Sequence, residues 1–287
     1  MKIDVTVMLP AYNEEQAIGK VIDDIHRAMK DTQYRYEILV VDDQSEDRTV
    51  EIAQAKNARV VKRVFRGGSG ASRRTGILAA EGEIIVMLDA DGTYEASDIP
   101  KMLAFFPDYD QVNGARTSEQ GTLKLLRAPA KWFIRKLACY LTRVNIPDLN
   151  TGLKAFKKSI MKKYLWVLPD GFSCVTTMTL AFLANGYAVK YIPSEYHPRI
   201  GQSKFHPVKD TYAYIHTVIR MVMYFKPLSV FMPVSGLLVL LGILKSLLSL
   251  VYTSTLQESD IIIFMVAVMT AAIGLLADLI VAYHKRD

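Results

Sequence analysis

The sequence predicts an α/β domain built on a mostly parallel sheet, followed by a helical membrane anchor. Three observations support this fold class. Apolar segments of strand length alternate repeatedly with segments of helical periodicity in the first third of the chain. The segment Ile84–Leu88 is apolar at every position, as expected of a strand buried on both faces of a parallel sheet. Two long apolar runs follow Pro227, and each has the roughly 20 residues needed to cross a bilayer.

The elements of the first half follow one another in a regular order. Helices are expected at about 15–30, from Asp47 onward, at 71–81 and at 98–106, because apolar residues recur there every three or four positions. A later helix is expected at 172–184. Strands that alternate with helices predict a parallel sheet with right-handed crossovers. The expected strands are Val5–Pro10, Tyr36–Val41, Arg59–Val64, Ile84–Leu88, Gln111–Arg116 and Tyr187–Pro193, and the segment 148–156 is expected to be a turn entering a further strand.

The composition divides the chain into three parts. Residues 1–206 form the predicted globular domain, and residues 228–287 form a transmembrane hairpin with spans at about 228–252 and 261–283. Between them, residues 207–227 are predicted to form a juxtamembrane helix in the membrane interface. Its apolar residues recur at helical spacing and are interleaved with cations, which is typical of interfacial helices.

The charges that flank the two spans predict their orientation. The connector 253–260 contains neither Lys nor Arg, whereas Arg220, Lys226 and the segment His284–Arg286 lie at the opposite ends. The positive-inside rule therefore predicts an integral membrane protein whose globular domain and C-terminus face the cytoplasm. Lys245 and Asp278 lie within the spans. Lys245 either extends to the interface or pairs with Glu258 or Asp260, and a functional role for either residue stays open.

The net charge of the chain points to anionic partners. Its 35 Lys and Arg exceed its 29 Asp and Glu, which gives a formal charge of +6. No nucleic-acid-binding motif is present, so the apolar tail favours a membrane surface and phosphorylated substrates. The basic stretch 123–143 is either a solvated face or a face that contacts anionic lipid or phosphate.

Asp89 and Asp91 directly follow the buried strand Ile84–Leu88. Ligands of open parallel sheets bind at the carboxyl ends of the strands. Carboxylates there can hold Mg²⁺ or Mn²⁺, which in turn binds phosphate oxygens. The alternative is that these aspartates only cap a helix or close a turn.

Three further polar segments follow strands or a loop. In 10–14, Tyr12 can contact a nucleobase and Glu14 can accept from ribose hydroxyls. The segment 42–49 can bind base or ribose, although helix capping by Ser45 or Asp47 explains it as well. The Gly-rich segment 67–74 leads to a helix N-terminus and carries arginines able to meet phosphate, but it lacks the Gly-Lys-Ser/Thr of a Walker loop. A nucleotide diphosphate with a divalent cation satisfies all of these segments.

Taken in order, these segments resemble glycosyltransferase family 2, which has the GT-A fold. The resemblance covers about residues 4–206. Later features resemble the polyprenyl-phosphate glycosyltransferases, which include dolichyl-phosphate mannose and glucose synthases. The residues that carry it are Pro10–Glu14, Val41–Asp43 with Ser45, Asp47 and Thr49, the segment 70–82, Leu88–Asp91, Asn150–Gly152 with Lys154 and Phe156, and Arg199-x-Gly201-x-Ser203-Lys204.

The resemblance implies a role for each matching residue. Asp91 is the closer metal ligand, and Asp148 lies beside the sugar site, where it acts as a base or positions the nucleophile. Thr93 stands where some relatives have a glutamine that reaches the metal, and relatives often have a serine in place of Lys131. The implied nucleoside ligands are Pro10, Ala11, Tyr12, Glu14 and Asp43; the ligands of Mg²⁺ or Mn²⁺ and diphosphate are Asp89 and Asp91; the acceptor-phosphate ligands are Arg116, Arg127 and Lys131; and Arg199, Ser203 and Lys204 close over the phosphates.

The resemblance also implies a reaction. A hexose would move with inversion from a nucleotide-diphospho-sugar, a UDP-sugar first and GDP-mannose second, to a polyprenyl or dolichyl phosphate in the bilayer. One alternative is transfer to a sugar hydroxyl, but the Gln-x-x-Arg-Trp of processive family members is absent. The other is a non-catalytic nucleotide-sugar-binding membrane subunit, against which the intact Asp89 and Asp91 argue. Self-association through the two membrane helices stays open.

Overall fold

The computed structural model describes residues 2–117, 135–136, 138–140, 142, 144–171, 173–200, 216, 219–220 and 223–284. The chain forms two compact units, Met1–Val218 and Ile219–Asp287. The predicted interfacial helix at 207–227 falls mostly outside the described residues.

The first unit contains a seven-stranded sheet in the order β3-β2-β1-β4-β6-β5-β7. Only β6 runs antiparallel to its neighbours, and all other pairs are parallel, which confirms the predicted mostly parallel sheet. The direction of β6 is a feature that the apolar pattern did not reveal. The strands are β1 (Val5–Ala11), β2 (Tyr36–Asp42), β3 (Arg59–Lys62), β4 (Ile84–Met87), β5 (Gln111–Arg116), β6 (Lys154–Lys157) and β7 (Val189–Ser194).

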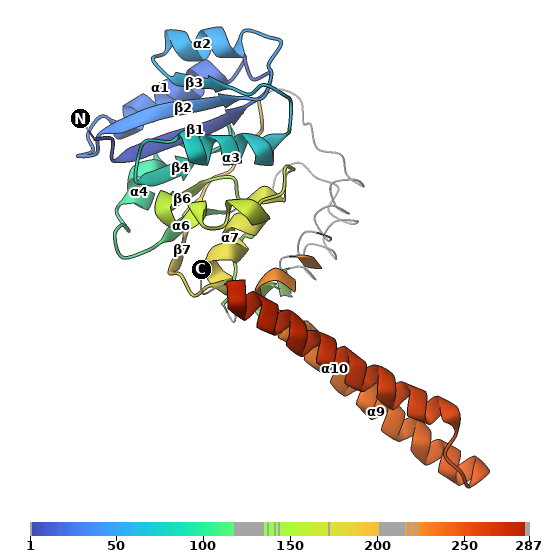
Figure 1. The fold of residues 1–287 in the computed structure, drawn as a ribbon. Helices are drawn as coiled ribbons and strands as arrows, with labels where there is room; N and C mark the ends of the chain where they lie inside the picture. Colours follow the sequence, from blue (N-terminus) through green and yellow to red (C-terminus); the bar gives the residue numbers. More distant parts are fainter. Residues whose placement is uncertain are drawn as a thin grey trace. The chain divides into compact units, whose positions relative to one another are not determined.

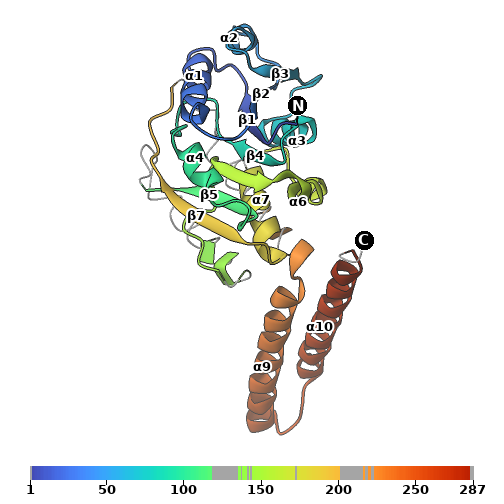
Figure 2. The same ribbon diagram turned by 90° about the vertical axis from the view of Figure 1, so that its left-hand side faces the viewer.

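Helices cover both faces of this sheet, as Figures 1 and 2 show. One face carries α1 (Ile18–Met29), α2 (Thr49–Ala55) and α4 (Asp98–Leu103). The opposite face carries α3 (Ser69–Ala79), α6 (Lys158–Lys162) and α7 (Cys174–Ala184), with a 3-10 turn at Leu165–Val167.

The side chains of β1 show how the sequence divides the core between these faces. Val5, Val7 and Leu9 pack on the side of α1, whereas Met8 packs on the side of α3. Successive strand residues point to opposite faces, so an all-apolar strand fills two cores at once. The predicted apolar stripe of the first helix is confirmed, since Ile18, Val21, Ile22, Ile25 and Met29 are all buried.

The register of the central strands brings three loops to one edge. Leu9 of β1 pairs with Val40 of β2, and Met8 pairs with Met87 of β4. Because the three strands are parallel, the residues that follow them, among them Asp43 and Asp89, leave the sheet at its carboxyl edge.

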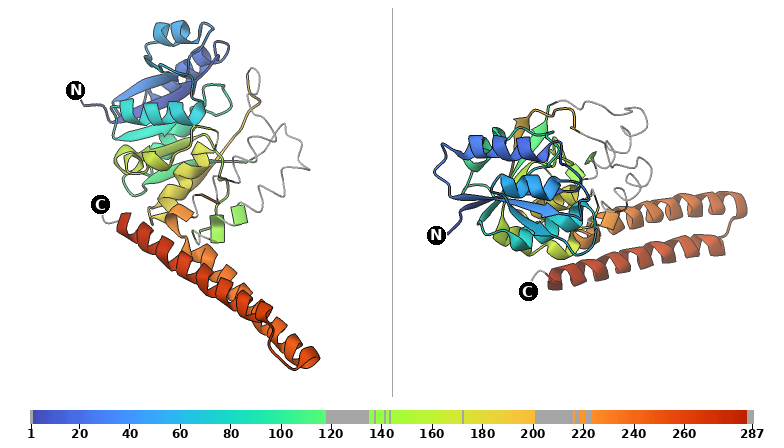
Figure 3. Two further views of the ribbon diagram at one scale, coloured as in Figure 1. Left: turned by 45° about the vertical axis from the view of Figure 1, so that its right-hand side comes forward. Right: turned by 90° about the horizontal axis from the view of Figure 1, so that it is seen from above.

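The second unit is a pair of antiparallel helices, α9 (Leu228–Thr253) and α10 (Glu258–His284), which lie side by side in every view (Figure 3). Both are long and apolar enough to cross a membrane. Small residues allow the helices close contact: Gly242 lies against Phe264, and Gly274 lies against Phe231.

One ion pair joins the hairpin near its turn. The Lys245 Nζ donates to Asp260 Oδ1 at 2.7 Å, and the Ser249 hydroxyl donates to the same oxygen at 3.3 Å. Pairing with Asp260 was one of the alternatives for Lys245, and the structure supports it over pairing with Glu258.

Candidate active site

The loops after β1 and β2 are joined by hydrogen bonds at the carboxyl edge. The Asn13 N–H donates to Ser45 Oγ at 3.0 Å, and the Glu14 N–H donates to Thr49 Oγ1 at 2.8 Å. Asp47 accepts the Thr49 N–H at 2.9 Å at the start of α2, whose N-cap is Arg48, whereas Ser45 braces the neighbouring loop. These contacts fix the backbone that follows Tyr12.

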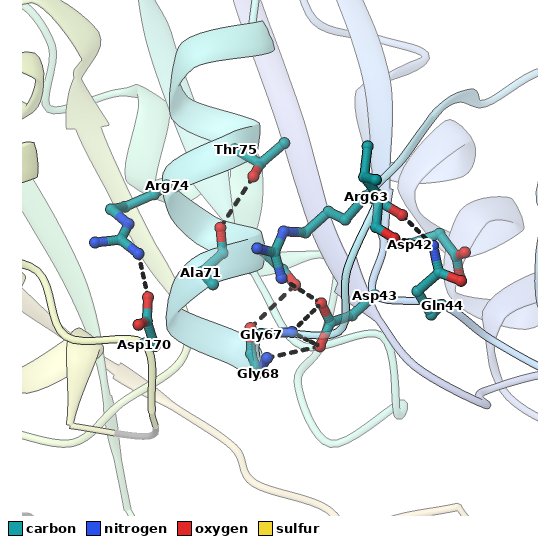
Figure 4. A network of polar contacts seen from close by, with 12 residues as sticks. Asp42, Asp43, Gln44, Arg63, Gly67, Gly68, Ala71, Arg74, Thr75 and Asp170 are labelled. Atoms are coloured by element: carbon teal, nitrogen blue, oxygen red, sulfur yellow. Dashed lines mark hydrogen bonds and ion pairs between the residues drawn. The ribbon is translucent and has the colours of Figure 1, made fainter.

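Asp43 is enclosed by the loop that joins β3 to α3 (Figure 4). Its carboxylate accepts from Arg63 Nη1 at 2.5 Å and from the Gly68 N–H at 2.7 Å. The neighbouring Arg66 guanidinium lies 3.9 Å from the centroid of the Tyr12 ring. Two residues predicted to hold a nucleoside are therefore brought close to the same loop.

The Gly-rich segment does not present a bare helix N-terminus. The N–H groups of Gly70 and Ala71 both donate to the Asp170 carbonyl, at 2.7 and 3.3 Å. Arg74 pairs with the Asp170 side chain. The expectation that this helix end meets phosphate therefore has to compete with bonds already formed inside the protein.

Asp89 lies beside a buried arginine. Arg73 Nη2 donates to Asp89 Oδ1 at 2.7 Å, and the Arg73 side chain is only 5% exposed. Burial raises the pKa of Asp89, and the Asp91 charge adds to this rise while Arg73 opposes it. Gly152, two residues before the antiparallel strand β6, lies against Asp89, and a Cβ at this position would overlap the Asp89 carboxylate.

Asp91 is more enclosed, with 9% of its side chain exposed. Its Oδ1 accepts from the Thr93 N–H at 3.1 Å and from the Thr93 hydroxyl at 2.6 Å. Thr93 therefore orients the Asp91 carboxylate, which is a different contact from the one made by the glutamine that some relatives carry.

Arg199 joins the loops that follow β1 and β4. It pairs with Glu14 through Nη2 and lies 3.5 Å from Asp91 Oδ2 through Nη1. The Ile200 N–H donates to the Asp91 carbonyl at 3.1 Å, which holds this segment across the edge. Ser203 and Lys204, which were predicted to act with Arg199, lie outside the described residues.

Arg116 and Asp148 form a bidentate pair, at 2.6 Å and 3.0 Å. Burial acts to raise the pKa of Asp148, but the hydrogen bonds and charge of Arg116 outweigh burial and hold the pKa below its usual range. Asp148 therefore stays an ionised carboxylate at neutral pH. Arg127 and Lys131, the other predicted acceptor-phosphate ligands, lie outside the described residues.

Sequence reasoning missed Arg63, and it offered Arg73 for phosphate and not as the partner of a carboxylate. Arg63 follows β3 as Asp43 follows β2, and the register Asp42 to Lys62 places the two side by side, so the strand ends carried a usable signal. Arg73 gave no comparable signal, because its contact with Asp89 depends on how α3 packs on the sheet.

The predicted metal ligands fit a hard divalent cation. Asp89 and Asp91 offer only oxygen donors, and their mutual repulsion is one that a cation would relieve. No third Asp, Glu, His or Cys joins them within the described part of the chain. Mg²⁺ is commonly held by one or two carboxylates plus substrate phosphates and water, so two carboxylates suffice.

Comparison with known proteins identifies the family. Residues 6–165 match the model for glycosyl transferase family 2, and residues 226–283 match the GtrB C-terminal hairpin. The chain is 34% identical over 206 residues to a dolichyl-phosphate hexose transferase of Haloferax volcanii, which covers 71% of this chain and 87% of the relative. It is 28% identical over 169 residues to a dodecaprenyl-phosphate galacturonate synthase of Rhizobium johnstonii, which covers 56% and 50% of the two chains.

Solved structures share the fold at low sequence identity. Glucosyl-3-phosphoglycerate synthase of Mycobacterium tuberculosis, in complex with Mn²⁺, uridine-diphosphate and glucosyl-3-phosphoglycerate, superposes with a TM-score of 0.59 at 20% identity. The match covers 77% of this chain and 79% of that one. The mostly parallel sheet, the family match and the apolar hairpin agree, and the protein is a member of glycosyl transferase family 2 with a GT-A-like fold and a GtrB-type C-terminal hairpin.

Proposed function

We propose that this protein transfers a hexose, with inversion and with the help of Mg²⁺ or Mn²⁺, from a nucleotide-diphospho-sugar to a polyprenyl or dolichyl phosphate. A UDP-sugar is the favoured donor and GDP-mannose the second. The observation that carries the proposal is the meeting of Asp89, Asp91 and Arg199 at the carboxyl edge of a chain that ends in a GtrB-type hairpin. This combination supplies a metal site, a phosphate-binding cation and a membrane anchor.

The relatives support the acceptor class and the structural neighbours support the donor class. The Haloferax protein is named as a dolichyl-phosphate hexose transferase, and the Rhizobium protein as a dodecaprenyl-phosphate galacturonate synthase. The mycobacterial enzyme was solved with Mn²⁺ and UDP, and also with Mg²⁺ and UDP.

The proposed reaction is a single displacement. An oxygen of the lipid phosphate attacks the anomeric carbon, and the nucleoside diphosphate leaves from the opposite face. The second pKa of a phosphate monoester is about 6, so the acceptor is already mostly a dianion at neutral pH. A strong general base is therefore unnecessary, and catalysis depends on positioning and charge stabilisation.

Asp148 fits a positioning role better than a basic one. A carboxylate whose pKa is lowered by Arg116 is a weak base, but it fixes the guanidinium plane through two bonds. Arg116, oriented in this way, is proposed to contact the acceptor phosphate. Arg127, Lys131, Ser203 and Lys204 are proposed to complete the phosphate contacts.

Asp89 and Asp91 would hold the metal ion, which offsets the charge that develops on the leaving diphosphate. Arg199 lies where it can exchange its carboxylate partners for diphosphate oxygens. Pro10, Ala11, Tyr12, Glu14 and Asp43 are proposed to surround the nucleoside.

The proposed organisation follows the charge pattern of the chain. Residues 1–206 form the catalytic domain in the cytoplasm, 207–227 an interfacial helix, and 228–287 the transmembrane hairpin. The cationic flanks of the spans would attract both anionic substrates to the same leaflet.

The test is a donor panel with purified full-length protein in detergent, supplied with Mg²⁺ or Mn²⁺ and a polyprenyl phosphate. The expected result is a polyprenyl-phosphate sugar from one nucleotide-sugar, lost on chelation and restored by the metal. Extension of a glycan acceptor without any lipid product would contradict the proposal in favour of a hydroxyl acceptor. Donor binding without transfer to either acceptor would favour a non-catalytic subunit.

A further inference from the structure

The segment that follows β7 is paired with the segment that follows β4. The His197 N–H donates to the Thr93 carbonyl at 2.9 Å, and Tyr94 forms an antiparallel bridge with Tyr196. Thr93 is also the residue whose N–H and hydroxyl orient the Asp91 carboxylate. The backbone of Tyr196 is therefore held at a fixed position relative to Asp91.

The side chain of Tyr94 connects Tyr196 to Asp89. The Tyr94 hydroxyl accepts the Gly152 N–H at 2.7 Å, and Gly152 lies against the Asp89 carboxylate. The Tyr94 ring packs edge-on against the Tyr196 ring, with centroids 5.2 Å apart and an interplanar angle of 71°. This is a preferred arrangement of two aromatic rings. The Tyr196 ring is thus braced by a buried residue that also supports Asp89.

The Tyr196 ring also contacts Arg116. The guanidinium carbon of Arg116 lies over this ring, 5.3 Å from its centroid, which is within the range of a cation–π contact. Asp148 holds the same guanidinium through two hydrogen bonds, at 2.6 and 3.0 Å. Asp148 therefore fixes the plane of the guanidinium, and the Tyr196 ring occupies the space beside that plane.

The separation of Arg116 from Asp89 and Asp91 matters for the proposed displacement. The acceptor phosphate would bind at Arg116, and the donor diphosphate would bind through the metal ion at the two aspartates. The attacking oxygen and the leaving diphosphate have to lie on opposite faces of the anomeric carbon. An error of about 1 Å in such an arrangement can cost about a hundredfold in rate.

We propose that Tyr196 is a positioning residue that sets the separation between Arg116 and the two aspartates, Asp89 and Asp91. Its ring carries this role, because the contacts with Tyr94 and Arg116 are both ring contacts. The proposal rests on the proposed function and adds to it a residue that links the donor side of the site to the acceptor side.

The first test compares two variants at Tyr196 in the full-length protein in detergent, with a polyprenyl phosphate as the varied substrate. Tyr196→Phe keeps the ring, so kcat/KM for the acceptor should stay within about threefold of the unaltered protein. Tyr196→Leu removes the ring and should lower this kcat/KM by about a hundredfold. Binding of UDP with Mn²⁺, measured by calorimetry without acceptor, should change by less than about twofold in both variants.

A double-mutant cycle tests whether Tyr196 acts through Arg116. Arg116→Met removes the guanidinium that the ring is proposed to position. In that background Tyr196→Leu should lower kcat/KM by less than about threefold, although it costs about a hundredfold alone. A ring that only stabilises the fold would give the same loss in both backgrounds.

Tyr109 offers a matched control. It precedes β5, at the sheet edge opposite the candidate site, and its ring also has an edge-on aromatic neighbour, Phe105, and a nearby cation, Lys190. Tyr109→Leu should therefore leave kcat/KM within about twofold of the unaltered protein. If Tyr196→Leu fails to fold, Tyr196→Met removes the ring while filling more of its volume, and the same losses are expected.

The outcomes separate this inference from the proposed function. Equal losses in Tyr196→Phe and Tyr196→Leu, additive losses in the cycle, or nucleotide binding that weakens in step with transfer would each overturn the role of Tyr196. Sugar transfer by the unaltered protein would stand in all three cases. Failure of the unaltered protein to form any lipid product would instead contradict the proposed function, and this inference with it.

Discussion

The two units of the molecule use their ion pairs differently. At the carboxyl edge of the sheet, each predicted ligand carboxylate already has an arginine partner: Asp43 with Arg63, Asp89 with Arg73, Asp148 with Arg116, and Glu14 and Asp91 with Arg199. In the hairpin, Lys245 and Asp260 join two apolar helices.

The difference lies in what could replace each partner. A guanidinium binds phosphate as readily as it binds carboxylate, and a carboxylate binds a metal ion. The pairs of the first unit are thus suited to exchange with a substrate. The hairpin pair lies within apolar helices and is suited to hold them in register. The predictions below test this division, beginning with the largest expected effect.

Asp91→Asn should abolish transfer while leaving the fold intact. Loss of a charged metal ligand removes charge stabilisation of the leaving group, for which about a thousandfold loss of turnover is reasonable. Thermal unfolding in detergent should change little, since an amide can still accept from Thr93. Asp24→Asn, in α1 where Asp24 pairs with Lys20 and Arg27, is the control and should keep full activity. Retained turnover would remove Asp91 from the site.

Asp148→Asn should affect both activity and stability. The pair with Arg116 is largely buried, with 12% and 15% of the side chains exposed, so its loss should cost about 3 kcal/mol of unfolding free energy. Misplacement of Arg116 should lower turnover by about a hundredfold. Steady-state rates and thermal melts distinguish the possibilities: loss of activity with unchanged stability would mean that Asp148 contacts substrate directly.

Lys154 belongs neither to the ion pairs of the carboxyl edge nor to the ion pair of the hairpin. It is fully buried on β6 and donates to the neutral oxygens of Thr179 at 2.6 Å and Asn113 at 3.3 Å. Burial lowers the pKa of Lys154 to about 7, against a smaller opposing effect of Asp148. The other charged or titratable groups that influence it are Arg73, Arg116 and Cys174.

The pH dependence of stability should reveal this lysine. Between pH 7 and the ordinary lysine pKa of 10.5, the unfolded chain binds a proton that the folded chain does not. Stability therefore rises with pH in that window, by up to about 1.4 kcal/mol per pH unit. From pH 7 to 9, the melting temperature of the unaltered protein should rise relative to that of Lys154→Met. Parallel curves would mean that Lys154 stays charged in the fold.

The smallest effect is expected in the hairpin. Asp260→Asn should lower the melting temperature only slightly, because an amide oxygen can still accept from Lys245 and Ser249. Transfer rates should stay within about twofold of the unaltered protein, since a structural pair supplies no charge stabilisation to the reaction. A large loss of turnover with an unchanged melting temperature would contradict a purely structural role of the hairpin pair and give it a role in the reaction.

Much of the fold followed from the sequence because its signals are local. The apolar run Ile84–Leu88 predicted a strand buried on both faces, and the period of the first helix predicted the buried stripe from Ile18 to Met29. The pattern could not give the direction of β6, because a short strand shows the same residue pattern in either orientation. β3 also ends at Lys62, two residues before its predicted end, where the chain turns toward Asp43.

The carboxylates of the candidate site were predictable, but the way its arginines pair with them was not. Strand ends converge by topology, so the order of strands and helices along the chain is enough to place Asp43, Asp89 and Asp91 at one edge. The partner of each carboxylate depends on distant packing, as with Arg199, which meets Glu14 across 185 positions of sequence. Such contacts leave no local pattern.

The bridge that Arg199 forms between Glu14 and Asp91 has a consequence for how a donor would enter. The charges of Glu14 and Asp91 are already balanced by Arg199. A nucleotide that arrives with its metal ion would therefore replace these internal ion pairs with new ones, its phosphates pairing with Arg199 and its metal ion with Asp91. Such a swap leaves the local charge nearly constant. The affinity for the donor should then depend only weakly on ionic strength, although both the donor and the residues of the site are charged.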